Sequence, residues 1–138
     1  MKVLFVAGVT PIVDDATSSR EFYGGKLSLP VTPVEGTDYS VAEIEGLKHF
    51  GLWTLADAAR STFGSDEWPS DVPRPQATIE FEVEDVAAAV AELKVGGLNI
   101  LQDTKLEAWG QTTARLLSPE GLLIGLTFTP WLRDQAGV

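Results

Sequence analysis

Cysteine is absent from this sequence and histidine occurs once, so several kinds of site are excluded at the outset. Without thiols the chain has no disulfides, no thiolate metal ligands and no cysteine nucleophile. The single histidine, His49, cannot build a catalytic centre without partners. No apolar run approaches the roughly 20 residues of a membrane-spanning helix. The lack of disulfides fits a reducing cytoplasm, where we expect the protein to reside.

Basic residues are also scarce, since 10 Lys and Arg stand against 20 Asp and Glu and give a formal net charge of −10. Proteins that bind nucleic acids place clustered Lys and Arg against the phosphates, so we expect no nucleic-acid partner, and no membrane partner either. The acidic field suits a cationic small molecule, although a solvated acidic surface explains the same charge. With 138 residues the chain is long enough for one globular core.

The two halves of the sequence share one pattern: an extended segment, an acidic pair, a helical stretch and a Gly-Gly. Asp15 and Asp85 are suited to cap the two helices, because a carboxylate accepts hydrogen bonds from the free N–H groups at a helix start. Gly24-Gly25 and Gly96-Gly97 can adopt the left-handed conformation that ends a helix. The second helix carries an apolar stripe at helical spacing, formed by Val86, Ala89, Val90 and Leu93.

Three further strands are expected after each helix, which makes each half β-α-β-β-β. In the first half they are Leu29–Val34, Tyr39–Ile44 and Lys48–Leu55, and in the second half Leu98–Leu101, Thr112–Leu117 and Leu122–Thr129. Neither half can bury a sheet face alone, so we expect one pseudo-symmetric domain over residues 1–138. Its parts are a first module of about 1–55, a linker of about 56–76, a second module of about 77–130 and a tail of 131–138.

Three short motifs follow one another along the chain: Phe22-Tyr23 with Leu27-Ser28-Leu29-Pro30, then Ile79–Val86, then Ala108–Gln111 with Leu117–Gly121. In this order and spacing they resemble the signatures of the glyoxalase / bleomycin resistance protein / dioxygenase superfamily, the vicinal oxygen chelate fold. Ser28 and Ser118 replace the usual glycine and aspartate, and both changes are tolerable in turns.

The resemblance implies an α+β fold in which two βαβββ modules form an eight-stranded, U-shaped mixed sheet around a cavity. The helices would cover the outer face, and the chain would commonly assemble as a homodimer. Members of the superfamily include lyases, isomerases, extradiol dioxygenases, antibiotic-modifying transferases and drug-binding proteins without catalytic activity. Fold alone therefore does not identify the reaction.

Metal-dependent members hold a divalent ion with His, Glu or Gln side chains from the first and last strands of each module. Their distances from the capping aspartates and the turn glycine transfer these positions to Gly8, Gly51, Thr78 and Gly125. Three glycines and a threonine cannot form such a site, which needs several imidazole or carboxylate ligands. His49 and Glu80 are the plausible replacements nearby, but two protein ligands are few for a tightly held ion. We therefore expect neither a metal nor another cofactor.

Strand alternation predicts which side chains face the cavity, because successive side chains of a strand point to opposite faces. The inward residues are His49, Gly51 and Trp53 in the first module, and Thr78, Glu80, Glu82, Leu123, Gly125 and Thr127 in the second. Large residues such as Leu126 alternate with them and should pack on the helices. Glycines at the former ligand positions are expected to leave room for a ligand beside an aromatic wall.

The candidate ligand-binding residues are His49, Trp53, Thr78, Glu80, Trp109 and Gly125. In the functional interpretation the two tryptophans are stacking walls and Glu80 and His49 are polar anchors. The structural alternative places Trp53 in the core, Trp109 at the module junction and Glu80 in water at a strand edge. No catalytic residue can be assigned.

Three functions are consistent with these residues. The leading hypothesis is a metal-free protein that binds a small, aromatic or cationic molecule, similar to the bleomycin-resistance branch. The second is a metal-dependent lyase or dioxygenase with displaced ligands. The third is a cofactor-free enzyme that transfers protons through Glu80 or His49.

Overall fold

The structure is a computed structural model that describes residues 1–135. The first module contains β1 (Val3–Val13), α1 (Ala16–Arg20), η1 (Glu21–Lys26), β2 (Val31–Pro33), β3 (Ser40–Ala42) and β4 (Phe50–Thr54). The helix α2 (Leu55–Phe63) follows. The second module contains β5 (Ala77–Val83), α3 (Val86–Val95), β6 (Gln102–Leu106), β7 (Thr112–Leu117) and β8 (Leu123–Phe128), and α4 (Pro130–Gln135) ends the described chain.

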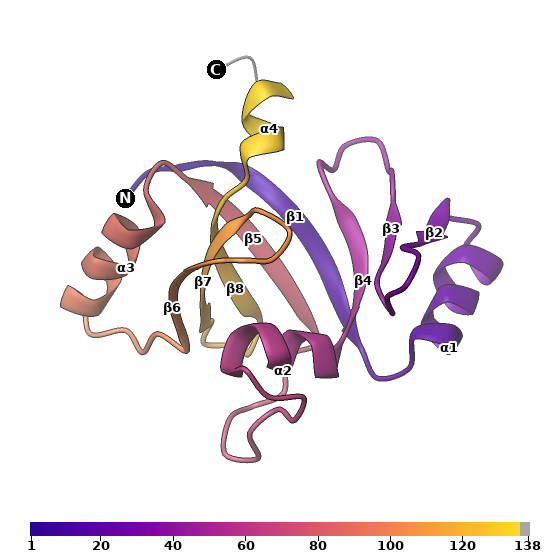
Figure 1. Cartoon of the computed structure of the whole chain (residues 1–138), viewed down its shortest axis with the longest axis horizontal. Helices are drawn as coiled ribbons and strands as arrows, with labels where there is room; N and C mark the ends of the chain where they lie inside the picture. Colours follow the sequence, from indigo (N-terminus) through magenta and orange to yellow (C-terminus); the bar gives the residue numbers. More distant parts are fainter. Residues whose placement is uncertain (136–138) are drawn as a thin grey trace.

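All eight strands form one mixed sheet in the order β2-β3-β4-β1-β5-β8-β7-β6, which confirms the predicted α+β fold (Figure 1). The two modules meet within the chain, where β1 and β5 pair antiparallel with Val9 opposite Ile79. Each of these central strands pairs in parallel with the last strand of its own module, so that Val9 lies beside Phe50 and Ile79 beside Ile124. The repeated register makes the next residues, Gly51 and Gly125, equivalent positions.

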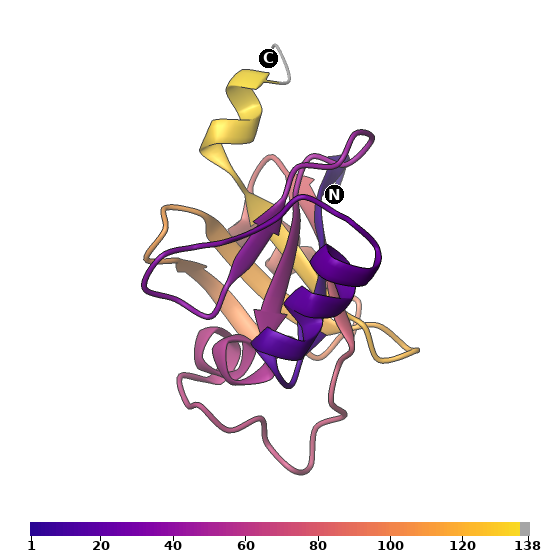
Figure 2. The same ribbon diagram turned by 90° about the vertical axis from the view of Figure 1, so that its right-hand side faces the viewer.

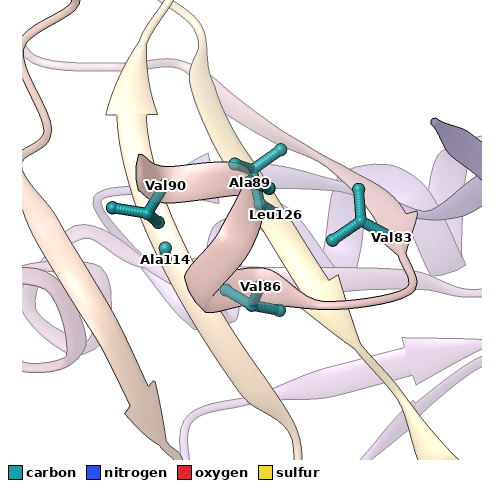
Figure 3. Close-up of a cluster of buried hydrophobic side chains, with 6 residues drawn as sticks. All are labelled: Val83, Val86, Ala89, Val90, Ala114 and Leu126. Atoms are coloured by element: carbon teal, nitrogen blue, oxygen red, sulfur yellow. The ribbon is translucent and has the colours of Figure 1, made fainter. Parts of the chain in front are cut away.

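Helices α1 and α3 lie outside the strands on opposite sides of the molecule (Figure 1). Both begin at the predicted aspartates, since Asp15 accepts from the N–H of Thr17 and Asp85 from the N–H of Ala88, each at 3.0 Å. The core between α3 and the sheet consists of Val83, Val86, Ala89, Val90, Ala114 and Leu126 (Figure 3). The predicted apolar stripe of this helix therefore packs on the sheet, and Leu126 lies on the helix-facing side.

The glycine pairs end the two helices differently from the prediction. Gly97 is left-handed, with φ +85°, as expected after α3. In the first module, however, Gly24 and Gly25 lie inside the π-helical segment η1, and the left-handed residue is Ser28, with φ +61°. Ser28 stands where the superfamily usually has glycine, and glycine adopts this conformation without the strain that a Cβ causes.

The predicted strand Leu98–Leu101 is wrong, because the strand after α3 is β6, four residues further along. Leu98 to Leu101 instead carry the chain from the helix end to the sheet edge, and the N–H of Leu101 donates to the carbonyl of Arg115. The apolar residues of Leu98–Leu101 are typical of a buried strand. The actual strand is polar because Gln102 joins a buried hydrogen-bond network on the other face of the sheet.

The segment expected to link the modules begins with α2. Thr54 caps this helix by accepting from the N–H of Asp57 at 3.1 Å, and left-handed Gly64 ends it. In Figure 1, α2 lies across one end of the sheet. At the other end α4 projects away from the sheet in both views (Figure 2), while Arg133 ties it to Glu82 at 2.8 Å. No helix in residues 1–135 is long and apolar enough to cross a membrane.

Candidate functional site

The inner face of the sheet is the face turned away from α1 and α3. Glu80 and Glu82 lie on it beside Gly125 and Thr127 of β8, and the Thr127 hydroxyl donates to Glu82 at 2.8 Å. Leu126, between the last two, packs toward α3 on the opposite face. The predicted alternation of side chains in the second module is therefore confirmed.

Glu80 occupies the centre of this face, between the two modules. It pairs with Gly8 across β1 and β5, and with Gly125 across β5 and β8. Two of the four positions that hold metal ligands in other members thus flank one carboxylate.

The space left by the glycines is occupied by neighbouring side chains. A Cβ added to Gly51 would lie 2.6 Å from Cζ of Tyr39, closer than such atoms approach. A Cβ added to Gly125 would lie 3.1 Å from Cγ of Glu80, which is also crowded. The expectation that these glycines leave room is therefore wrong: Tyr39 and Glu80 fill the room that the missing side chains vacate.

Tyr39 and His49 form a neutral pair on the first-module side. The Tyr39 hydroxyl is hydrogen-bonded to Nε2 of His49, and the planes of the two rings are nearly parallel, with 4° between them. Burial lowers the pKa of His49 below its ordinary 6.5, against the opposing charge of Glu80. Burial raises the pKa of Tyr39, and the negative charge of Glu80 adds to that effect. Both rings are consequently uncharged near neutral pH.

Glu80 is also the meeting point of the second-module contacts. Its Oε1 accepts from Nε2 of Gln111 at 3.3 Å, and its Oε2 lies 3.9 Å from Nη2 of Arg115. Trp109 donates from Nε1 to Gln111 at 3.0 Å, and the Arg115 guanidinium lies 5.1 Å from the centre of the Trp53 ring. Each candidate tryptophan therefore reaches Glu80 through one intermediate residue. The carboxylate keeps 16% of its side chain exposed.

Arg115 anchors a closed polar cluster next to this carboxylate. The two hydrogens of its Nη1 are shared among Ser61 and Gln102, each at 2.7 Å, and Glu107 at 3.1 Å, and only 1% of its side chain is exposed. Since Ser61 belongs to α2, that helix covers this part of the inner face. The neighbouring Glu107 accepts from Ser61 and from Thr113 as well. A buried ion pair of this kind depends on its hydrogen bonds for stability, and only Nε of Arg115 has no partner in this cluster among residues 1–135.

The other predicted residues lie at different depths. Thr78 is buried next to Leu123, and its hydroxyl has no hydrogen-bond partner among residues 1–135. Trp109 is about half exposed, at 49%. The structure brings Glu80 and Gly125 together directly and places His49 within the electrostatic influence of Glu80. Trp53 and Trp109 are connected to Glu80 through Arg115 and Gln111.

Three residues of the site were not among those predicted from the sequence: Tyr39, Gln111 and Arg115. Strand alternation contains the signal for Arg115, which pairs with Gly125 across β7 and β8 and so shares its face. Gln111 belongs to one of the motifs that carry the family resemblance. Tyr39 precedes β3, and its contact with His49 depends on a loop path that alternation does not describe.

The residues present do not fit a divalent metal ion. Within residues 1–135, no group of three or more His, Cys, Asp or Glu side chains is placed to hold one. At the four positions of the usual ligands, the glycines offer no donor atom and Thr78 offers one buried hydroxyl. His49 and Glu80 lie near these positions, but His49 is engaged by Tyr39 and Glu80 by Gln111.

Two surface hollows lie away from these residues. One, of about 380 Å³, is lined by residues of α1, η1 and the β2 region, and the other, of about 230 Å³, lies between residues 71–73 and the ends of β7 and the α3–β6 loop. Neither is lined by any of the six candidate residues.

The sequence matches the family described as Glyoxalase/Bleomycin resistance protein/Dioxygenase superfamily over residues 7–126. No curated protein matches it significantly. A superfamily member from Vibrio splendidus 12B01 is 14% identical, with a TM-score of 0.57 over 89% of this chain and 98% of that chain. Methylmalonyl-CoA epimerase of Streptomyces coelicolor, bound to 2-nitronate-propionyl-CoA, is 17% identical, with a TM-score of 0.59 over 91% and 94%. A hypothetical protein from Bacillus halodurans C-125 is 18% identical, with a TM-score of 0.58 over 89% and 92%. At these identities the likeness to solved structures is one of fold.

Proposed function

Because the chain belongs to the glyoxalase/bleomycin resistance protein/dioxygenase superfamily, we propose that it binds a small molecule on the inner face, around Glu80, without a metal ion. The observation that carries the proposal is the position of Glu80 between the two modules. One carboxylate there acts electrostatically on the neutral Tyr39–His49 pair on one side and is hydrogen-bonded to Gln111, the partner of Trp109, on the other.

The chemistry of these groups favours a cation that carries an aromatic or other apolar body. Glu80 supplies a negative charge that remains partly exposed, and the net charge of −10 adds a long-range attraction for cations. The half-exposed indole of Trp109 offers a face for stacking or for a cation–π contact. His49 adds a neutral ring whose Nε2 is already hydrogen-bonded to Tyr39.

Tryptophan fluorescence tests the proposal with benzyltrimethylammonium as the probe and neutral benzyl alcohol as its uncharged counterpart. We expect saturable quenching by the cation, weaker quenching by the alcohol, and loss of the difference in Glu80→Gln. Glu43→Gln is the matched control, because Glu43 is an exposed residue and the variant changes the net charge equally. Binding that Glu80→Gln leaves unchanged, or a broad panel of cations without effect, would refute the proposal.

The second candidate function is proton transfer by a cofactor-free enzyme. The observation that favours it is the electrostatic effect of Glu80 on Tyr39 and His49, since its charge raises the pKa of both groups and perturbed titratable groups suit acid–base catalysis. This hypothesis requires that the protein turns over a substrate and that Glu80→Gln or His49→Ala abolishes the turnover. Ligand binding should persist in at least one of the two variants.

The metal-dependent alternative is tested by elemental analysis of protein purified without chelators. We expect substoichiometric zinc, nickel, iron and manganese, because too few ligands converge. One equivalent of a divalent ion that is lost in Glu80→Gln would overturn the metal-free assignment.

We also propose that the chain forms a homodimer, as superfamily members commonly do. The support is a row of exposed apolar residues, Val3, Leu4 and Val6, on the half of β1 that lies before its pairing with β4 begins at Val9. Sedimentation equilibrium should give twice the chain mass, and Val6→Glu should reduce it to the chain mass. A monomeric wild-type protein at micromolar concentration would exclude the dimer.

A further inference from the structure

The larger hollow lies in the first module, away from the inner face. It has a volume of about 380 Å³ and lies between the helical segment α1–η1 and the edge strand β2. The lining consists of one charged residue and six uncharged ones, four of which carry apolar side chains: Arg20, Gly24, Leu29, Pro30, Val31, Thr32 and Pro33. A hollow with a single charge among apolar groups selects a ligand with one opposite charge and an apolar body.

Arg20 is held in place without a carboxylate. Its Nε donates to Oγ of Ser40 at 2.5 Å and its Nη2 to the carbonyl of Tyr39 at 3.4 Å, so two neutral acceptors orient the guanidinium. Within the described part of the chain, Arg20 makes no ion pair, whereas the other arginines all do: Arg60, Arg74, Arg115 and Arg133. Arg20 is therefore an arginine whose orientation is fixed while its charge is not balanced by a carboxylate in contact with it.

The wall beside Arg20 cannot accept another β-strand. Pro33 has no N–H group, and the N–H of Val31 is already donated to the carbonyl of Leu29 at 2.8 Å. The edge strand therefore lacks the donors with which a peptide would extend the sheet. What remains is a small apolar surface next to an oriented guanidinium, which suits a small molecule.

We propose that this hollow is a second binding site, for a small monocarboxylate with a short apolar chain. The guanidinium of Arg20 binds the carboxylate, for which its planar fork is well matched, and Leu29, Val31 and Pro33 contact the chain. A single positive charge balances a monocarboxylate, whereas a phosphate dianion would leave one negative charge unpaired. The site differs from the proposed inner-face site in position and in the charge of its ligand, so either proposal can fail alone.

Two-dimensional NMR of the full chain tests the site with butyrate and with butyramide, its uncharged counterpart. We expect butyrate to shift the Arg20 Nε–H resonance and the amides of residues 29–32 in a saturable way, and butyramide to have little effect. Equal shifts from the two compounds, or butyrate shifts confined to other residues, would overturn the proposal.

Variants separate the charge from the fold. Thr32→Glu places a carboxylate at the hollow without removing a hydrogen bond of Arg20, and should weaken butyrate binding by about tenfold or more. Thr32→Gln is the isosteric control and should retain binding, as should Arg74→Gln, which removes an exposed arginine elsewhere. Arg20→Gln should abolish binding in a protein with an otherwise unchanged spectrum. Undiminished binding in Thr32→Glu would contradict the assignment.

Discussion

The two modules share one backbone plan but differ in what occupies their inner faces. In the first module the space at Gly51 is filled by Tyr39, which forms an uncharged hydrogen-bonded pair with His49. At the equivalent Gly125 of the second module the space is filled by Glu80, with Arg115 and Glu107 behind it. The helix α2 covers this charged cluster through Ser61.

This difference shows that the duplicated fold determines where side chains point, while the residues that fill the glycine positions determine the chemistry. Burying a neutral pair costs little desolvation free energy, so a substitution in such a pair should change the stability of the protein only modestly. A buried cluster of charges is stable only when every partner is present, because desolvation of an unpaired ion costs far more than its hydrogen bonds return.

The largest effect should come from breaking the charged cluster of the second module. Arg115→Met leaves the buried Glu107 with only the more distant ammonium of Lys105, at 3.7 Å, and we expect the free energy of unfolding to fall by about 3–5 kcal/mol. Arg74→Met removes an exposed ion pair with Asp14 and should change it by less than about 1 kcal/mol. Urea denaturation measures both. A cost below about 1 kcal/mol for Arg115→Met would mean that the cluster is not a structural unit.

Adding a methyl group at each glycine grades the crowding of the inner face. Gly51→Ala should cost about 1–3 kcal/mol, because its Cβ overlaps the Tyr39 ring. Gly125→Ala should cost less, since the flexible Glu80 side chain can move. Gly8→Ala meets His49 only at an ordinary 3.4 Å and should be neutral or slightly stabilising. Thermal unfolding of the three variants tests this order. A reversed order would contradict the conclusion that neighbouring side chains occupy the space at Gly51 and Gly125.

The left-handed residue two positions beyond the end of η1 and of α3 offers a reciprocal exchange. Ser28 and Gly97 both have positive φ, but only the first carries a Cβ. Ser28→Gly should therefore stabilise the protein by about 1 kcal/mol, and Gly97→Ser should destabilise it by a similar amount. Calorimetry gives both values. If the two exchanges change stability in the same direction, the left-handed conformation does not account for the difference.

Two hydroxyl groups distinguish a satisfied polar atom from an unsatisfied one. Tyr39→Phe removes the hydrogen bond to His49 and should cost about 1 kcal/mol. Thr78→Val removes a buried hydroxyl without a partner and should stabilise the protein by up to about 1 kcal/mol. Chemical denaturation measures the two changes. Destabilisation by Thr78→Val would indicate that this hydroxyl has a partner, such as an ordered water molecule.

Local chemistry predicted the parts of the fold that depend on local rules. The caps at Asp15 and Asp85 and the inward alternation at Glu80 follow from residues close in sequence, and all are present. Leu98–Leu101 was misassigned because apolar residues of a connection resemble a buried strand. The helix α2 was missed because the prolines and charges that follow it dominate that segment.

The site was less predictable because its contacts join distant segments. Filling of Gly51 by Tyr39 depends on the loop before β3, and the burial of Arg115 depends on Ser61, 54 residues earlier in the chain. A glycine in the sequence indicates that no side chain is present at that position. It does not indicate which neighbouring residue occupies the space.

Glu80 is the electrostatic centre of the inner face, and its negative charge raises the pKa of His49 against the effect of burial. Burial lowers the pKa of His49, so the unfolded chain, with an ordinary value of 6.5, binds this proton more readily than the folded protein. The contribution of His49 to stability is therefore complete above pH 6.5 and is lost as the pH falls through the folded-state value.

NMR titration of the His49 ring in the wild type and in Glu80→Gln tests this claim most directly. We predict a wild-type midpoint below 6.5 and a still lower midpoint in the variant, because the carboxylate that stabilises the imidazolium is gone. A midpoint that the substitution leaves unchanged or raises would contradict the account.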